Sequence, residues 1–224
     1  MKKVILSAFA VSVIGLTAFT GAVSEKNEST TVAATQELVL PAAATTYNVD
    51  TQKSALAWEA KKVTGQHNGL IKIKNGKLQV DNKKPVSGSF DIDMTSITVL
   101  DIEDPGYNKK LVDHLKNDDF FSVDKHPTAN FKTVAIAPIT NAKAGGATHN
   151  VRGNLTIKGI TQPVSFPATI TTDGKTLRAV AEITIDRSKF DVRYGSTSFF
   201  DGLGDKAIYN DIKFNLDLVA AAGA

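Results

Sequence analysis

The chain has 224 residues, of which 42% are hydrophobic and 22% charged, proportions typical of a soluble globular protein with one core or at most two small domains. It contains no cysteine, which excludes disulfides, thiolate metal sites and thiol catalysis. The formal net charge is only +3, and Lys2 and Lys3 supply two of these charges, so we expect no nucleic-acid partner.

Residues 1–22 have the pattern of a secretory signal peptide. Lys2 and Lys3 form a positive start, an apolar stretch follows, and small residues end it at Ala22. We expect cleavage after Ala22 and a periplasmic or secreted protein, the alternative being an uncleaved membrane anchor. Residues 23–46 are rich in Ser, Thr and Ala, which predicts either a flexible tether or a disordered terminus without a function.

From residue 47 to residue 219, apolar and polar residues alternate with period two, as in half-buried β-strands. Two dipeptides, Asn75-Gly76 and Asp173-Gly174, predict tight hairpins. Residues 220–224 are expected to form a C-terminal tail. The pattern predicts nine strands, over residues 56–60, 71–73, 78–80, 86–94, 131–135, 151–157, 164–170, 179–185 and 212–218.

Strands with one apolar face must close into a barrel or pack as a sandwich. Sequential hairpins without long crossovers favour an antiparallel up-and-down β-barrel. Closure of a simple meander needs an even number of strands. Either Thr46–Val49 is a further strand or two of the nine are one bent strand, so we predict an all-β barrel of about eight strands.

Two long connections interrupt the alternation, the first over residues 98–127 and the second, long and irregular, over residues 187–207. The first contains one short helical pattern from Asn108, a suitable N-cap, to Lys116, with Leu111 and Leu115 on its apolar face. Since these connections follow the fourth and eighth strands, they should meet over one mouth of the barrel. The opposite end, expected around Gly65–Gly69, should carry short turns.

The inward-facing residues converge on one interior. Some inward positions are small, such as Gly88 and Gly153, which leaves room or merely marks a bend. Eight strands give a barrel that side chains just fill or that holds one ligand, so periodicity leaves a cavity and a filled core equally open. The large members of the inward set are Trp58, Phe90, Met94, Phe131, Leu155, Phe166, Ile183, Phe214 and Leu216.

Patterns for catalysis and metal binding are weak. The four histidines form no i,i+2 or i,i+4 pair, and no G-x-S-x-G motif is present. We therefore expect no enzyme, no metal and no catalytic cofactor. His114, Arg187 and Tyr194 could meet the polar head of a lipid at the mouth, or they form a solvated rim. With Asp113 they would also be the groups available to a lipid-modifying enzyme.

Seven short motifs, in this order and spacing, carry a family resemblance: Gly65–Gly69, Gly88–Ile97, Leu111–Phe121, His126–Phe131, Gly153–Ile160, Asp186-Arg187 and Tyr194–Ser196. Together they resemble the YceI-like family of lipocalin-like, polyisoprenoid-binding envelope proteins over residues 47–219. The resemblance implies an extended lipocalin-like barrel with a long apolar pore. It implies a bound isoprenoid lipid, of the quinone or polyprenyl phosphate class, and no catalytic residues.

The leading hypothesis is therefore a lipid-binding protein of the cell envelope that serves transport, storage or a stress response. Two alternatives stay open: a lipid-modifying enzyme with a polar cluster at the barrel mouth, and a filled structural barrel that acts through its surface. The sequence also leaves a homodimer open.

Overall fold

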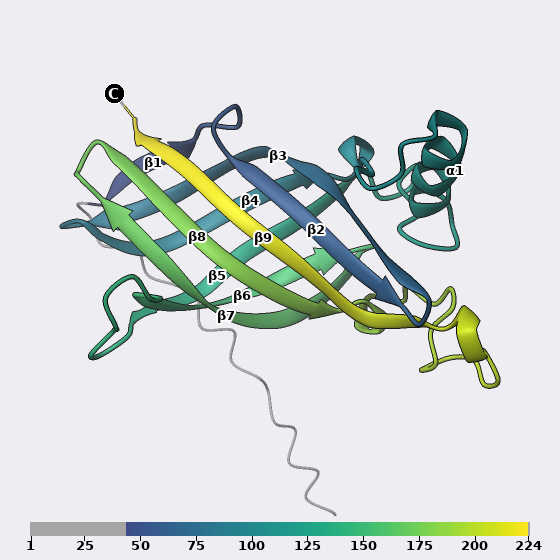
Figure 1. Cartoon of the computed structure of the whole chain (residues 1–224). Helices are drawn as coiled ribbons and strands as arrows, with labels where there is room; N and C mark the ends of the chain where they lie inside the picture. The colour runs from purple at the N-terminus through teal and green to yellow at the C-terminus, as the bar shows by residue number, and fades with distance from the viewer. Residues whose placement is uncertain (1–43, 224) are drawn as a thin grey trace, which may run out of the picture. The chain divides into compact units, whose positions relative to one another are not determined.

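The computed structural model describes residues 44–223 (Figure 1). The expected signal peptide and residues 23–43 of the expected tether lie outside the described residues. Within residues 44–223, no helix has the length and apolar character needed to cross a membrane.

Strands β2 to β9 form a closed antiparallel barrel, because each pairs with the next in the chain and β9 pairs with β2. The antiparallel barrel of about eight strands expected from the sequence is thus confirmed. The strands are β1 (Thr45–Val49), β2 (Ala55–Lys62), β3 (Gly65–Asp81), β4 (Lys84–Asp93), β5 (Thr128–Pro138), β6 (His149–Ile157), β7 (Ile160–Thr172), β8 (Thr176–Asp186) and β9 (Ile208–Ala222).

The ninth strand shares one position of the barrel with another. Both β1 and β2 lie between β3 and β9, since Tyr47 pairs with Leu78 and Ala222 while Leu56 pairs with Ile71 and Leu216. The even count needed for closure is therefore met although nine strands exist. The final strand continues to Ala222, so most of the segment expected as a tail belongs to the sheet.

The prediction of a hairpin at Asn75-Gly76 is wrong. Strand β3 continues through it, with a shift of register against β4 between Ile73 and Asn75. A Cβ atom on Gly76 would lie 2.6 Å from the Phe90 ring, so glycine is needed here for close packing rather than for a turn. The chain turns instead at Asn82 and Lys83, whose φ angles of 48° and 65° suit a two-residue hairpin. The Asp173-Gly174 hairpin is confirmed.

The helix of the first long connection begins earlier than predicted. Helix α1 spans Pro105–Lys116, with Asp104 as the N-cap, whose carboxylate accepts a hydrogen bond from the Tyr107 amide. Asn108, expected as the cap, lies inside the helix and donates to the carbonyl oxygens of Val99 and Ile102. Its side chain thereby fixes α1 to the preceding loop.

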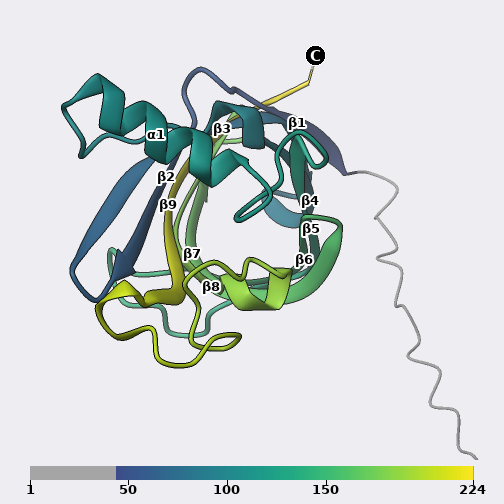
Figure 2. The same cartoon turned by 90° about the vertical axis from the view of Figure 1, so that its right-hand side faces the viewer.

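Both long connections lie at the same end of the barrel, as predicted (Figure 2). We call this the mouth end. The rings of His114 in the first connection and Tyr194 in the second have centroids only 4.6 Å apart. The opposite end carries the turns at 82–83 and 173–175, but also the longer connection 139–148. Gly65–Gly69 was expected there and instead begins β3 at the mouth end, because the β2–β3 turn lies beside the long connections.

Three aromatic side chains from β4, β5 and β7 meet inside the barrel. Phe90, Phe131 and Phe166 form a chain of rings with centroid separations of 6.3 Å and 5.7 Å. Their rings cover the small residues: a Cβ on Gly88 would meet Phe90 at 2.9 Å, and one on Gly153 would meet Phe131 at 2.4 Å. These glycines therefore accommodate aromatic rings.

Candidate functional site

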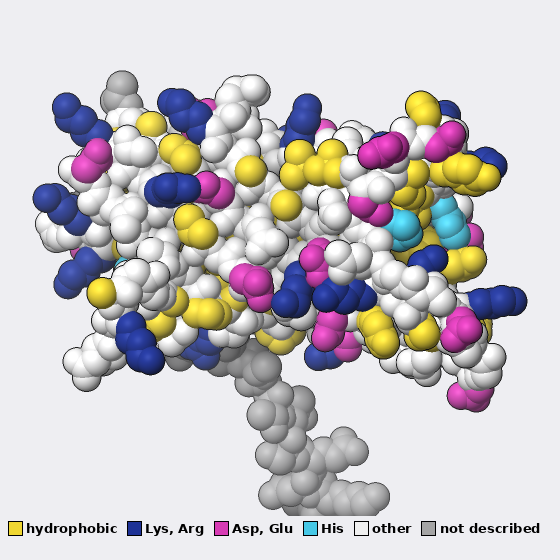
Figure 3. All heavy atoms as spheres, in the orientation of Figure 1, with side chains coloured by type: hydrophobic (Ala, Val, Ile, Leu, Met, Phe, Trp, Pro, Cys, Tyr) yellow, Lys and Arg dark blue, Asp and Glu magenta, His cyan; other side chains and the backbone are white. Residues whose placement is uncertain are grey.

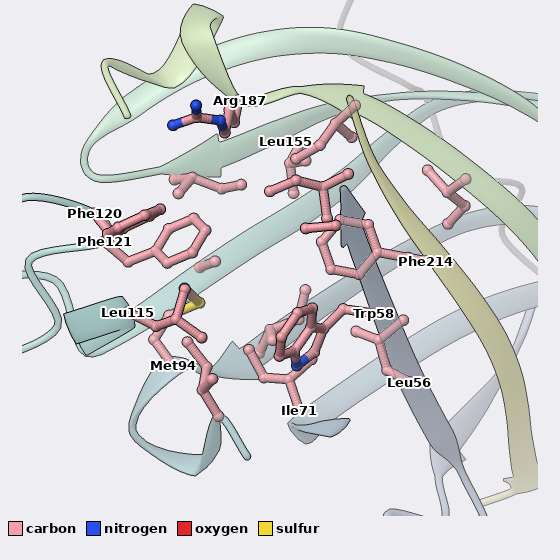
Figure 4. Close-up of a pocket in the computed structure, with 18 of the residues that line it drawn as sticks. Leu56, Trp58, Ile71, Met94, Leu115, Phe120, Phe121, Leu155, Arg187 and Phe214 are labelled. Carbon is pink, nitrogen blue, oxygen red and sulfur yellow. The ribbon is translucent and has the colours of Figure 1, made fainter. Parts of the chain in front are cut away.

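An apolar cavity of about 140 Å³ occupies the half of the barrel below the mouth (Figure 4). Its walls come from β2, β3, β4, β5, β6, β8 and β9, and its roof from α1 and the loop that follows it. Every lining side chain but that of Arg187 is predominantly apolar. An engineered cavity of about 150 Å³ with a similar lining stays dry and binds benzene, so this one is suited to apolar groups.

Some residues of the predicted inward set line this cavity and others do not. Phe90, Phe166 and Leu216 pack in the core but do not line the cavity. Of the two outcomes left open by the sequence, a cavity and a filled core, the structure shows a cavity inside the barrel. The predicted residues that line the cavity are Trp58, Met94, Phe131, Leu155, Ile183, Phe214 and Arg187.

The only tryptophan of the chain, Trp58, lies in the cavity wall. Its indole Nε1 donates a hydrogen bond to the carbonyl oxygen of Thr98, at 3.1 Å. The backbone of Gly69 passes directly behind this contact, where a Cβ atom would lie 1.8 Å from the Thr98 oxygen. Glycine at position 69 therefore allows the first long connection to dock on β3 and to hold the indole in place.

A lid of aromatic and aliphatic side chains covers the cavity at the mouth. Leu115 of α1 and the adjacent Phe120 and Phe121 lie on the side of the cavity opposite Trp58 and Phe214 (Figure 4). The two phenylalanines were not predicted as lining residues. The sequence contained a signal for them, because two consecutive aromatic residues in a polar loop do not fit the alternation of a strand and need another apolar surface to pack on.

The outer side of this lid joins the two long connections. Phe120 lies 4.9 Å from His114 and 5.3 Å from Tyr194, measured between ring centroids. His114 also contacts Asp119 through Nε2, at 3.1 Å. His114 and Tyr194, both predicted as site residues, therefore stand on the rim above the lid and do not line the cavity.

Arg187 lies at the mouth end of the cavity, and only 2% of its surface is exposed. Its guanidinium donates to three carbonyl oxygens, those of Tyr209, Val192 and Ile208. Among the described residues no carboxylate forms an ion pair with it. Burial lowers the pKa of Arg187 to about 10, so the group stays charged at neutral pH.

The guanidinium also lies over the Phe120 ring, with 5.9 Å between Cζ and the ring centroid. Arg187 thus ties the second long connection to β9 and touches the lid of the cavity.

A second, more polar hollow of about 460 Å³ lies outside the lid. Tyr194, which contacts Phe120, forms part of its wall. Three cations and three carboxylates line it together with apolar groups, so it differs in chemistry from the cavity. The lining comprises Asp118, Asp119, Lys158, Asp191, Arg193, Tyr194, Gly195, Phe200, Leu203 and Lys206.

The four polar groups considered for catalysis do not share a site. His114 and Tyr194 are in contact, but Arg187 is bound to backbone carbonyls and Asp113 forms an exposed ion pair with Lys109. Within residues 44–223, no cluster of three His, Cys, Asp or Glu residues could hold a metal ion. The geometry favours binding of an apolar molecule.

Comparison with known proteins agrees with this geometry. A family profile described as the YceI-like domain matches residues 47–220. The chain belongs to the YceI-like domain family. Curated relatives include UPF0312 proteins of Pseudomonas putida (strain W619), 29% identical over 107 residues, and of Pseudomonas aeruginosa (strain PAO1), 31% identical over 100 residues. These matches cover 48% and 45% of this chain, and it spans about half the length of the curated relatives it matches.

Solved structures of this fold include Burkholderia cenocepacia BcnA, with a TM-score of 0.61 and 29% identity over 77% of this chain and 99% of that chain. A domain from Saccharophagus degradans, described as polyisoprenoid-binding, matches with a TM-score of 0.53 and 12% identity over 79% of this chain and 98% of that one. At that identity the likeness shows the fold alone.

Proposed function

We propose that this YceI-like barrel binds the tail of a long isoprenoid lipid, of the quinone or polyprenyl phosphate class, in the cavity below the mouth. The observation that carries the proposal is an almost wholly apolar cavity inside a barrel, covered by a lid of three side chains. The domain from Saccharophagus degradans described as polyisoprenoid-binding supports the same ligand class through its shared fold.

The size of the cavity requires the lid to move. Sites for drug-sized ligands usually measure about 300–1,000 Å³, and this cavity measures about 140 Å³. Each methylene group transferred from water contributes about 0.8 kcal/mol, so even a few isoprene units offset the loss of some aromatic contacts. We infer that Phe120 and Phe121 swing away with α1 as the tail enters from the mouth end.

The chain's N-terminal pattern extends the proposal to its location. Residues 1–22 have the composition of a cleaved signal peptide, which would place the barrel in the periplasm or outside the cell. Transport, storage or a stress response that depends on an isoprenoid lipid would all use the same binding site.

The proposal is tested by identifying the lipid that co-purifies with the full chain and by titrating it with isoprenoids. Trp58 is the only tryptophan and lies in the cavity wall, so its fluorescence reports directly on occupancy. We expect lipid in organic extracts and saturable quenching of Trp58 by an isoprenoid quinone. An empty extract together with unchanged Trp58 emission at every added isoprenoid concentration would overturn the proposal.

A further inference from the structure

The exposed large hydrophobic side chains are unevenly distributed over the surface of this protein. Most of them lie at the mouth end, where apolar side chains gather around α1 at the right-hand end of Figure 3. Two others, Val134 and Val180, lie on the barrel strands β5 and β8. The mouth-end set, which we call the apolar rim, comprises Val63, Leu70, Leu100, Tyr107, Tyr194, Phe199, Phe200 and Tyr209.

The apolar rim lies at the same end of the barrel as the lid of the cavity. Its members come from the β2–β3 turn, the outer face of β3, both long connections and the first residues of β9. Tyr194 belongs to both the rim and the aromatic contacts of the lid. A ligand that displaces the lid therefore passes beside Tyr194.

We propose that the mouth end docks on the surface of a lipid bilayer, with the apolar rim inserted at the membrane–water interface. This inference rests on the proposed function, because an isoprenoid lipid resides in bilayers and is insoluble in water. Docking of the mouth would let the tail pass between bilayer and cavity without exposure to solvent, which costs about 0.8 kcal/mol per methylene.

The residue types of the rim fit a bilayer interface. Three of the eight are tyrosines, whose apolar ring and polar hydroxyl suit the headgroup region, and lysines such as Lys62 and Lys110 can extend toward water from the same level. The rim also draws on several segments at the mouth end, so it can enter an interface through several anchors.

Charge at the mouth end indicates what holds it to the membrane. The first connection carries both cations, such as Lys109 and Lys116, and acids, such as Glu103 and Asp104, and the second connection is mixed in the same way. No large field of one sign results. Docking should therefore depend on insertion of apolar side chains and persist on vesicles of neutral phosphatidylcholine and at high salt.

The experiment uses the full chain and its lack of cysteine. Single substitutions Leu100→Cys and Tyr209→Cys at the rim, and Lys175→Cys in the β7–β8 turn at the opposite end, each accept one environment-sensitive fluorophore. With phosphatidylcholine vesicles, we expect a blue shift and quenching by spin-labelled lipid at positions 100 and 209, and neither at 175. Residues 1–43 are identical in all three, so they contribute equally.

A matched pair of variants tests the rim itself. Leu100→Ser with Phe200→Ser should weaken vesicle partition roughly tenfold, whereas Val134→Ser with Val180→Ser should leave it unchanged, since all four side chains are exposed and the fold should tolerate both pairs. Uptake of an isoprenoid from vesicles should slow in the first pair only. The affinity of the Leu100→Ser, Phe200→Ser variant for the same isoprenoid delivered in detergent should equal that of the wild type.

Two outcomes would overturn docking, and a third would remove only the proposed ligand. Labels at 100 and 209 that stay in water in the presence of vesicles exclude it. A blue shift without quenching by spin-labelled lipid would mean that a second copy of the chain covers the rim. Insertion into vesicles combined with no Trp58 response to any isoprenoid would retain docking and remove the proposed ligand.

Discussion

The rings of His114 and Tyr194 meet edge to face, with their centroids 4.6 Å apart, and this contact joins two connections that lie far apart in the sequence. Phe120 packs beneath both rings and also lines the cavity. Three aromatic side chains thus connect the outside of the mouth to the apolar interior, and they are where entry of a ligand should be controlled.

Removing one ring of this group should open the lid. We expect Tyr194→Ala to cost about 1 kcal/mol in stability, because aromatic pairs contribute about 0.5–1.5 kcal/mol each and Tyr194 is 46% exposed. Isoprenoid uptake from detergent micelles, followed by Trp58 fluorescence in stopped flow, should be several-fold faster. Tyr194→Phe keeps the ring and should behave as the wild type; equal rates for the Ala and Phe variants would argue against a role for this ring in the lid.

Gly69 should be intolerant of any side chain. In Gly69→Ala the new Cβ would lie 1.8 Å from the Thr98 oxygen and 2.7 Å from Trp58 Nε1, so the first long connection must shift away from β3. We expect a loss of at least about 2 kcal/mol in urea unfolding and a red shift of Trp58 emission.

The matched control is Gly65→Ala, whose Cβ would have only Lys62 Cε nearby, at 3.9 Å. We expect little change in stability or emission for this variant. Similar losses for Gly65→Ala and Gly69→Ala would show that glycine is needed at both positions for backbone freedom rather than for the Trp58–Thr98 contact.

Arg187 is expected to serve both the fold and the polar head of the ligand. In Arg187→Lys an ammonium group replaces the guanidinium that donates to three carbonyls, which should cost about 2–4 kcal/mol while keeping the charge. In Arg187→Met both the hydrogen-bond donors and the positive charge are lost. We expect the preference for polyprenyl phosphate over the corresponding polyprenol to survive in the Lys variant and to fall in the Met variant. An unchanged preference in folded Arg187→Met would restrict this residue to support of the fold.

Stability should fall in mild acid through His149 on β6. Burial lowers the pKa of His149 below its usual 6.5, so the unfolded chain takes up the proton more readily than the folded barrel. The contribution of this residue is therefore complete above about pH 6.5 and is lost as the pH falls from that value through the folded-state pKa. His149→Gln should show a flatter dependence of unfolding free energy between pH 7 and pH 5; an identical slope in both proteins would contradict the assignment.

The alternation of apolar and polar residues was sufficient to predict an antiparallel barrel. It also placed both long connections at one mouth, because in a meander the end at which a connection lies depends only on its position in the strand order. The inward phase of Trp58, Met94, Leu155 and Phe214 followed from the same period of two, since one residue of displacement would turn every apolar side chain to solvent.

Other features depended on contacts between distant segments. Asn75-Gly76 is a strong local hairpin signal, yet the continuous apolar face of β3 and the close approach of Phe90 to Gly76 determine its conformation. No local pattern reveals that aromatic rings cover Gly88 and Gly153, or that Phe120 meets Tyr194 above the cavity. The period of a strand specifies which way a side chain points, whereas the space left between side chains depends on how all strands and both long connections pack together, and only the tertiary structure decides it.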